Sequence, residues 1–470
     1  MKRNVVVLSM FLVLAMSVLE SSAFANPAPP SLSDVTSTTM VIGGRNYHEV
    51  QATLNGTGSG GAYRVPVEFL YPVNPSECNG TGIVDLLNNS AMVLAAPIGG
   101  AVRPLATARA RLKDKFIGEK GYSYVSVQWE KDRNAITTFN QLFGTNYVIP
   151  TLDDQFAIIL DAGSLLKSPP AGLPGSPCAV DKAVAYGFSA STGPIVQLKF
   201  QSHPLAAAFA ATFDASLIDS TTSGFGTVTM PKDGGLTIVI SSETDVVLFR
   251  NDLTMRGQTS TYRQYEIPGS SHVTTDQHDL DDIVAGLPFA PTPPVRHSLA
   301  KNSPVHRAMM EHLRRWMNDG TPPPPSVTLD GSNYPLTPLP CVGLPIPGIA
   351  TIPRDADGNA LGGVRLPYLA RPLGHYNGIE LQYGCSAGGF PQVAIVAGTF
   401  IRDDAMINRY KNHGEYVSGV SKAADFAFQQ GWILDADRQA YKDQAGQCPV
   451  GRIPTEELTL DDMKFCHDLD

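Results

Sequence analysis

A serine occupies a position suited to a nucleophile in the pentapeptide GFSAS, residues 187–191. A short apolar run precedes this pentapeptide, and small and apolar residues follow it in a helical register. This pattern is typical of a nucleophile elbow, a tight turn between strand and helix that exposes the serine Oγ at the C-terminal edge of a sheet. Such a turn requires small neighbours, and its usual last glycine is replaced here by Ser191.

Two further residue types are needed, because a serine hydroxyl is a weak nucleophile without a base and a group that orients the base. After a nucleophile elbow, the expected chain order is an acidic residue and then a histidine, each following a strand. Glu243 and Asp245 follow the apolar run LTIVISS, and His272 follows YEIPGSS. The order predicts Ser189 as nucleophile and His272 as general base.

The acid and the oxyanion hole are less closely defined by the pattern. We favour Asp245 as the acid, on loop reach and on the commoner use of Asp in this role, and Glu243 is the alternative. The oxyanion hole needs backbone N–H donors, one from the residue after the nucleophile and one from the loop after an earlier strand. These positions correspond to Ala190 and Asn89.

A metal site is the competing interpretation of the histidine loop. The candidate ligands lack the i, i+4 helical spacing that places two histidines on one face, so we expect no metal and no organic cofactor. These candidates are His272, Asp276, His278 and Asp279.

The flanking segments alternate between strand and helix patterns, which favours a mostly parallel sheet with helices on both faces. Strands are expected at 40–54, 63–71, 82–87, 122–129, 183–186, 236–241 and 262–267, and helices at 103–117, 156–166 and 304–317. The apolar segment 206–213 is expected to form a buried strand. Residues 326–400 have the pattern of short strands and turns, and residues 403–444 that of two helices.

The composition is that of a globular protein, with 43% hydrophobic and 17% charged residues in 470. The net charge of −9 argues against nucleic-acid binding. Basic residues, an apolar run and the small-x-small pattern Ala23-Phe24-Ala25 predict a signal peptide over residues 1–25. No later segment is apolar enough to span a membrane, so we expect a secreted or periplasmic bacterial protein.

Domain organisation is inferred from the proline run at 322–325, which separates a core over residues 26–325 from residues 326–470. The six cysteines form an even set without a C-x-x-C pair, which favours disulfides in an exported chain. A bond between Cys448 and Cys466 is the first candidate, because it would tie down the C-terminal tail.

Segments along nearly all of the mature chain resemble the alpha/beta hydrolase superfamily, and more narrowly the exported bacterial alpha/beta hydrolase domain family. They are VEFLYP, CNGTGIVDLLN, GYSYVSVQW, GFSAS, ISSETDV, YEIPGSSH, HLRRWMNDGTPPP, DADGNALGGVRLP and EYVSGVSKAADFAFQQGWIL. The resemblance implies an alpha/beta hydrolase fold and a triad of Ser189, Asp245 and His272. It also implies that residues 326–470 are an extension packed on the core within the same domain. Phe188 departs from the polar or acidic residue expected before the nucleophile in many relatives.

The leading hypothesis is therefore an exported serine hydrolase that cleaves carboxylic esters, small or polymeric, through an acyl-enzyme. The same triad would also serve an acyltransferase or an amidase. A non-catalytic binding protein with this fold is the third alternative, and the competent residues at all three triad positions count against it.

Overall fold

The computed structural model describes residues 29–469 apart from several internal gaps. The gaps are 89–106, 132–135, 138–139, 142–143, 201, 222–229, 233, 276–296, 339–347 and 380–397. The predicted signal peptide, Asn89, and the candidate metal ligands Asp276, His278 and Asp279 lie outside the described residues.

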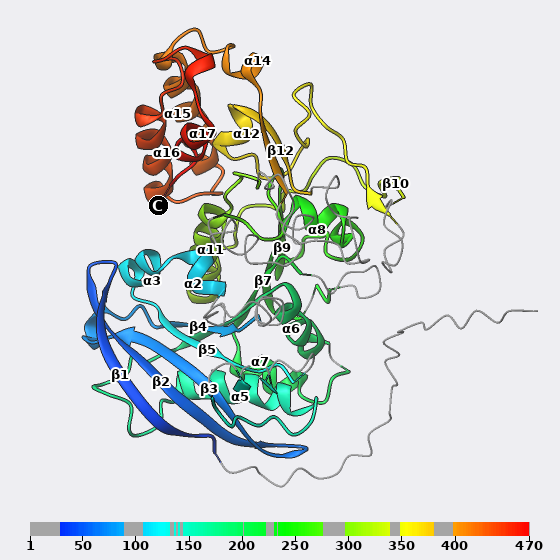
Figure 1. The fold of residues 1–470 in the computed structure, drawn as a ribbon. Coiled ribbons are helices and arrows are strands. Elements are labelled where there is room, and N and C mark those ends of the chain that lie inside the picture. The colour runs from blue at the N-terminus through cyan, green and yellow to red at the C-terminus, as the bar shows by residue number, and fades with distance from the viewer. Residues whose placement is uncertain are drawn as a thin grey trace, which may run out of the picture.

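A nine-stranded sheet runs through the molecule in the order β1-β2-β3-β5-β4-β6-β7-β8-β9 (Figure 1). The first three strands form an antiparallel meander, and β3 pairs antiparallel with β5. All further pairings in the sheet are parallel, so the predicted mostly parallel sheet is confirmed. The bounds are β1 Ser31–Ile42, β2 Arg45–Gly58, β3 Gly61–Pro72, β4 Thr81–Leu86, β5 Ser123–Val127, β6 Lys182–Phe188, β7 Ala215–Asp219, β8 Leu236–Ser242 and β9 Tyr262–Ile267.

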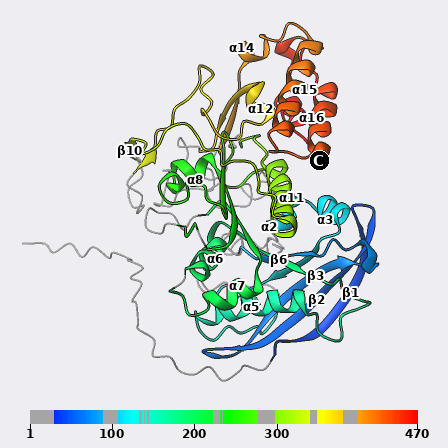
Figure 2. The same ribbon diagram turned by 180° about the vertical axis from the view of Figure 1, so that it is seen from behind.

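Helices cover both faces of this sheet, as Figures 1 and 2 show. One face carries α5 (Asp154–Lys167), α6 (Thr192–Lys199) and α7 (Ala206–Thr212), and the other carries α2 (Thr107–Leu112), α3 (Asp114–Lys120) and α11 (Ser303–Asp319). Successive side chains of β6 point to opposite faces of the sheet. Val184, Tyr186 and Phe188 join the core cluster of α2, α3 and α11, whereas Ala183 and Ala185 join that of α5, α6 and α7.

The prediction of a buried strand at 206–213 is wrong, because this segment forms α7. Alanine has the highest helix propensity, and among residues 206–212 only Phe209 is buried. The strand that belongs at this point of the sheet is β7, whose five residues are all buried.

The first predicted strand, 40–54, is in fact a hairpin of two strands. β1 ends at Ile42 and β2 begins at Arg45, with Gly43 and Gly44 between them, both at positive φ. Two consecutive glycines with positive φ permit the tight turn that splits the run. The helix predicted at 103–117 is likewise divided, into α2 and α3, at Lys113, which has a φ of 71°.

The C-terminal segment, residues 326–469, is built from two short strand pairs and several helices at the end of the molecule opposite β1–β3 (Figure 1). Its elements are β10 (Leu336–Thr337), β11 (Ile349–Ala350), α12 (Pro367–Ala370), β12 (Gly374–Asn377), β13 (Thr399–Arg402), α14 (Asp404–Ile407), α15 (His413–Gln429), α16 (Asp435–Gln447) and α17 (Leu460–Cys466).

This segment also pairs with the edge of the main sheet. Val327 donates its N–H to Gln264 O, and Glu266 donates its N–H to Val327 O, both at 2.9 Å. Val364 then donates to Glu266 O at 2.8 Å. The C-terminal segment therefore covers the β9 edge, whose backbone groups would otherwise need water.

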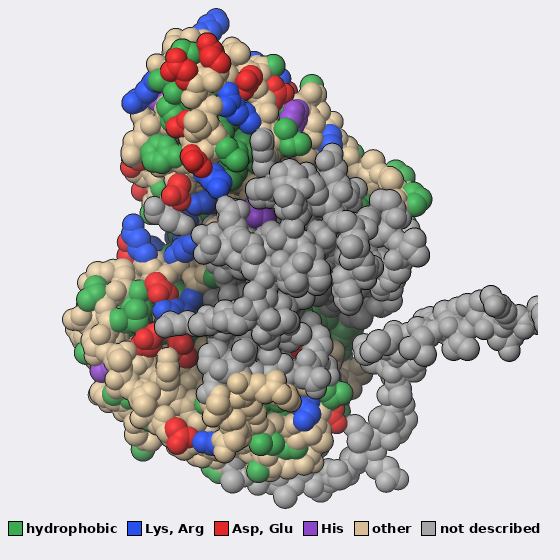
Figure 3. All heavy atoms as spheres, viewed as in Figure 1, with side chains coloured by type: hydrophobic (Ala, Val, Ile, Leu, Met, Phe, Trp, Pro, Cys, Tyr) green, Lys and Arg blue, Asp and Glu red, His purple; other side chains and the backbone are tan. Residues whose placement is uncertain are grey.

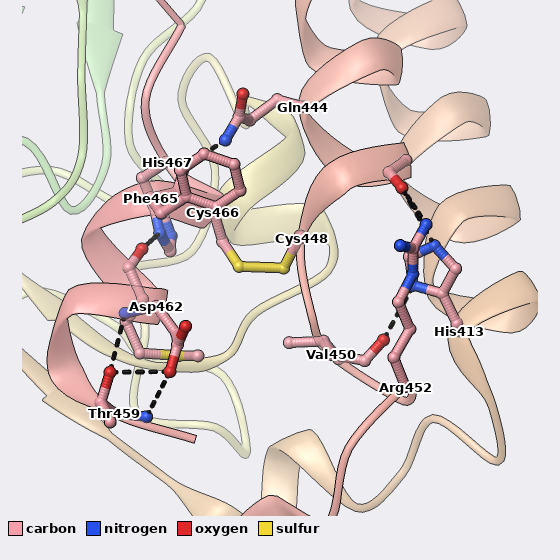
Figure 4. Close-up of a disulfide and its surroundings, with 12 residues drawn as sticks. His413, Gln444, Cys448, Val450, Arg452, Thr459, Asp462, Phe465, Cys466 and His467 are labelled. Carbon is pink, nitrogen blue, oxygen red and sulfur yellow. Dashed lines mark hydrogen bonds between the residues drawn. A yellow bond between two sulfur atoms is a disulfide. The ribbon is translucent and has the colours of Figure 1, made fainter. Parts of the chain in front are cut away.

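Two disulfides lie among the described residues, and the predicted bond between Cys448 and Cys466 is confirmed. Figure 4 shows that it joins the end of α16 to the end of α17, where the Gln444 side chain also donates to Phe465 O. The second bond, Cys78 to Cys178, connects the loops before β4 and before β6. Cys341 and Cys385 are outside the described residues.

Charged side chains of both signs are mixed over the outer surface of the C-terminal segment in the view of Figure 3. Among the described residues, no helix combines the length and the apolar character needed to cross a membrane.

Candidate active site

The turn after β6 has the backbone of a nucleophile elbow. Phe188 is extended, and Ser189 begins a short 3-10 turn, Ser189–Ser191, that leads directly into α6. Ser189 has a φ of 56°, a left-handed conformation that costs about 1–3 kcal/mol for a non-glycine residue and is held by its surroundings. A Cβ at Gly187 would lie 2.6 Å from Ser191 O, so the position before Phe188 admits only glycine.

Ser191, the departure from the usual glycine, has a structural function in the elbow. Its Oγ accepts from the Phe188 N–H and donates to Phe188 O, both at 2.8 Å. Asn88 Nδ2 donates to the same carbonyl at 3.1 Å. The hydroxyl therefore pairs with the buried backbone N–H of the last residue of β6. Pro194 falls in the first turn of α6, where its missing N–H has no helical partner to lose.

Asp245, the predicted acid, lies in α8 (Glu243–Val247), directly after β8. Ser242 is the N-cap of this helix, and its Oγ accepts from Asp245 N–H at 3.2 Å. Asp245 Oδ2 in turn accepts from the Ser242 N–H at 2.6 Å and from its hydroxyl at 2.7 Å. This capping box fixes the Asp245 side chain and leaves Oδ1 for another donor.

His272 lies between Asp245 and Ser189. Its Nδ1 is 2.7 Å from Asp245 Oδ1 and its Nε2 is 2.9 Å from Ser189 Oγ. The Phe188 ring packs against the imidazole at 5.0 Å between centroids, and the Phe249 ring approaches edge-on at 5.3 Å. Two aromatic neighbours therefore restrict the rotation of the imidazole, and only 7% of its side chain is exposed.

Glu243, the alternative acid, does not contact the imidazole. Its Oε2 accepts from the Gly269 N–H at 2.7 Å, and its Oε1 accepts from Arg354 Nη2 at 2.7 Å. The structure therefore brings Asp245, and not Glu243, to His272.

Arg111, a buried arginine of α2, supports the site and was not anticipated from the sequence. Its Nη2 donates to His272 O at 3.2 Å, and its guanidinium lies 5.3 Å from the centre of the Phe188 ring. Its sequence signal is its spacing. Arg111 lies three residues after Ala108, on the same face of the helix, and directly before Leu112.

Asp219, at the end of β7, balances the charge of this arginine. Its Oδ2 accepts from Arg111 Nε at 3.0 Å and from the Tyr186 hydroxyl at 2.7 Å, and His306 Nε2 lies 3.0 Å from Oδ1. Burial alone would raise the pKa of Asp219, but the charges of His306 and Arg111 outweigh it and hold this pKa well below its usual value. The carboxylate therefore stays ionised beneath the site.

Of the two predicted oxyanion-hole residues, Ala190 lies directly after Ser189 at the start of the 3-10 turn. Its backbone N–H is thus in the first turn of a helical segment, where N–H groups lack partners within the helix. Asn89 is outside the described residues. Its neighbour Asn88 is buried, and its Nδ2 donates to Phe188 O in the elbow. Within the described part of the chain, no group of three or more His, Cys, Asp or Glu side chains is arranged to hold a metal.

Comparison with solved structures finds partial likenesses. A CE15 glucuronoyl esterase from Teredinibacter turnerae aligns at 12% identity and a TM-score of 0.24, over 44% of this chain and 46% of that one. A putative dienelactone hydrolase from Klebsiella pneumoniae aligns at 15% identity and a TM-score of 0.25, over 51% and 87%. A glucuronoyl esterase from Solibacter usitatus aligns at 14% identity and a TM-score of 0.28, over 48% and 70%. The chain thus spans less than half the length of the first of these proteins.

Comparison with curated protein sequences gives no significant match. The family model described as alpha/beta hydrolase domain matches residues 45–443, from the start of β2 into α16. This match includes the elbow, both later loops and most of the C-terminal segment, and the mostly parallel sheet with helices on both faces agrees with it. The chain belongs to the alpha/beta hydrolase domain family.

Proposed function

We propose that this protein is a serine esterase that hydrolyses carboxylic esters through an acyl-enzyme. The observation that carries the proposal is the continuous chain of contacts from Ser189 Oγ to His272 Nε2, 2.9 Å, and from His272 Nδ1 to Asp245 Oδ1, 2.7 Å. A carboxylate beside Nδ1 favours the tautomer in which Nε2 is unprotonated and can accept the serine proton.

In the proposed first half-reaction, Ser189 Oγ forms a bond to the ester carbonyl carbon while His272 Nε2 takes the hydroxyl proton. The carbonyl π electrons move to the oxygen, and the backbone N–H of Ala190 donates to the resulting oxyanion. We assign Asn89 as the second donor, as the sequence predicts. Collapse of this intermediate breaks the bond to the alcohol oxygen, which leaves with the proton from His272.

In the second half-reaction, water replaces the alcohol. His272 Nε2 removes a proton from the water as its oxygen attacks the acyl carbon, and the same donors stabilise the second oxyanion. Release of the carboxylic acid returns the proton to Ser189 Oγ. No step requires an oxidant, a reductant or a cofactor.

We further propose that the mature protein acts outside the cytoplasm. Support comes from the N-terminal pattern of residues 1–25 and from two disulfides, which persist in oxidising compartments.

The test is active-site labelling with a fluorophosphonate probe, which reacts with an activated serine. Wild type should be labelled and Ser189→Ala should not. Ser216→Ala is the matched control, because it removes a buried hydroxyl that accepts from Lys199 Nζ at 3.5 Å, and it should be labelled like wild type. Equal labelling of wild type and Ser189→Ala would remove Ser189 from the proposed role.

A second measurement identifies the acyl acceptor. Turnover of a panel of activated esters, with and without an added alcohol, should yield free acid as the main product. A dominant transesterified product would make the enzyme an acyltransferase, and no turnover of any ester by folded protein would overturn the esterase proposal.

A further inference from the structure

We propose that Glu243 is a positioning residue. Through it, the C-terminal segment keeps Asp245 and His272 within hydrogen-bond distance of each other. This inference rests on the proposed function. We define the acid loop as residues 242–245 and the base loop as residues 268–272. Glu243 belongs to the acid loop, and its side chain is fully buried.

The Glu243 carboxylate joins three separate parts of the chain. Oε2 accepts from the N–H of Gly269 in the base loop at 2.7 Å. Oε1 accepts from Arg354 Nη2 at 2.7 Å and from the Gly378 N–H at 3.3 Å, and both of these residues belong to the C-terminal segment. One anion is therefore the common acceptor for the base loop and the C-terminal segment.

Neighbouring groups repeat this three-way connection. The Glu243 N–H donates to Ser270 O at 3.1 Å, which joins the two loops through their backbones. The Thr244 Oγ1 accepts from the His272 N–H at 3.1 Å and donates to Gly378 O. The residue that carries the imidazole is thus attached to the acid loop and, through Thr244, to the C-terminal segment.

The contact between these three segments is too close to accommodate a side chain. A Cβ at Gly378 would lie 2.5 Å from Ser270 O, 2.6 Å from Glu243 Cβ and 2.9 Å from Thr244 N. A Cβ at Gly269, where φ is 72°, would lie 2.8 Å from Tyr376 Cβ. A displacement of the C-terminal segment toward the two loops must therefore move the acid loop or the base loop.

Small displacements matter for this chemistry, because a misplacement of about 1 Å can lower a rate by about 10²-fold. Loss of Arg354 would also leave the buried carboxylate without its cation, which favours a rearranged loop. We therefore expect variants of this junction to lower kcat by about 10- to 100-fold while KM changes by less than about threefold, since the proposed mechanism places neither Glu243 nor Arg354 in contact with the substrate.

The experiment compares Glu243→Gln, Arg354→Gln and the double variant by steady-state kinetics on an activated ester. Each single variant should lower kcat, and the double variant should cost little more than either one, because both remove the same connection. Arg354→Lys should recover part of the loss by restoring the charge. Where Glu243→Gln does not fold, Arg354→Gln and Gly378→Ala test the same junction from the C-terminal side.

The matched control is Asp437→Asn, which breaks another buried pair between core and C-terminal segment, Arg307 with Asp437. It should lower the melting temperature and leave kcat within about twofold of wild type, because this pair touches neither loop. If the Glu243 and Arg354 variants lose melting temperature and keep wild-type kcat, their role is structural and the inference is overturned. Failure of wild type itself to label or turn over would instead overturn the proposed function.

Discussion

At the scale of single residues, the two oxygens of Asp245 have different partners. Oδ2 accepts from the N–H and the hydroxyl of Ser242, and Oδ1 faces His272 Nδ1. The helix cap therefore orients this carboxylate independently of its contact with the imidazole. The S-x-x-D spacing of Ser242 and Asp245 is a sequence signal for that cap.

We predict that Asp245→Asn folds and loses activity. Both Ser242 groups donate to Oδ2, so the amide oxygen should take that position and the amide NH₂ should face His272 Nδ1. Nδ1 must then accept, which places the imidazole proton on Nε2, where it cannot receive the serine proton. We expect kcat to fall by about 10³- to 10⁴-fold with KM little changed.

Steady-state kinetics and the unfolding free energy in urea check this prediction together. A variant of wild-type stability that retains more than a tenth of wild-type kcat would contradict the orientation of the carboxylate described above.

At the scale of elements, the site is formed where β6, β8 and β9 end at the same edge of the sheet. Parallel strands bring their carboxyl ends together, so three residues distant in the chain meet without long loops. Helix α2 adds Arg111 from one face of the sheet. Its own start is attached to the sheet by Asp85 of β4, whose Oδ2 accepts from the Ala108 N–H and the Tyr124 hydroxyl, both at 2.8 Å.

We predict a pH-dependent contribution of Asp85 to stability. Burial raises the pKa of this fully buried carboxyl to about 7, against the opposing effect of its two hydrogen bonds. An unfolded Asp has a pKa of about 3.9, so between about pH 4 and 7 the folded state binds more protons than the unfolded state. Stability should therefore fall as pH rises through this window, by up to about 1.4 kcal/mol per pH unit, and level off above it.

The measurement is urea unfolding of wild type and Asp85→Asn at several pH values from 4.5 to 8.5, roughly the range that spans the two pKa values. The difference in unfolding free energy between wild type and Asp85→Asn should decrease as the pH rises to about 7 and then stay constant. Parallel stability curves for the two proteins would show that Asp85 does not titrate as stated.

At the scale of the whole molecule, the C-terminal segment and the sheet share one continuous core cluster. Tyr376, Phe400 and Tyr416 pack in the same cluster as Ile240 and Ile267 of the central strands. Figures 1 and 2 show α11 between the sheet and the C-terminal helices from both sides. The two disulfides reinforce opposite parts of this arrangement, one between the loops that precede β4 and β6 and one in the C-terminal tail.

We predict that the two disulfides contribute unequally to stability. The Cys78–Cys178 bond closes a sequence separation of 100 residues, and the Cys448–Cys466 bond closes one of 18. Loop-closure entropy gives about 4.7 kcal/mol for the longer loop and about 3.2 kcal/mol for the shorter. The Cys78→Ala/Cys178→Ala variant should thus lose about 1.5 kcal/mol more than Cys448→Ala/Cys466→Ala.

Urea unfolding without reductant compares the two double variants, and reduced wild type serves as the reference for loss of all disulfides. A larger loss from the C-terminal pair would mean that packing of α17 outweighs chain entropy.

Much of the fold was predictable because its signals are local. Buried parallel strands such as β8 are nearly continuous apolar runs, and the GFSAS elbow has a characteristic composition. The segment 206–213 was misassigned because a short apolar run has no periodicity that separates strand from helix. Arg111 was missed because its partners, Asp219 and His272, are more than 100 residues away in the chain.

The sequence by itself predicted the elbow, the chain order Ser189, Asp245 and His272, and the family. It favoured Asp245 over Glu243 as the acid, but it could not show the partners of either side chain, because two carboxylates two residues apart have the same local chemistry. Tertiary structure decided that their side chains point to different partners. Ser242 orients Asp245 toward His272, while Arg354 and Gly378, from a segment more than 100 residues later, hold Glu243 away from it. Such long-range contacts exist only once the C-terminal segment has packed on the sheet.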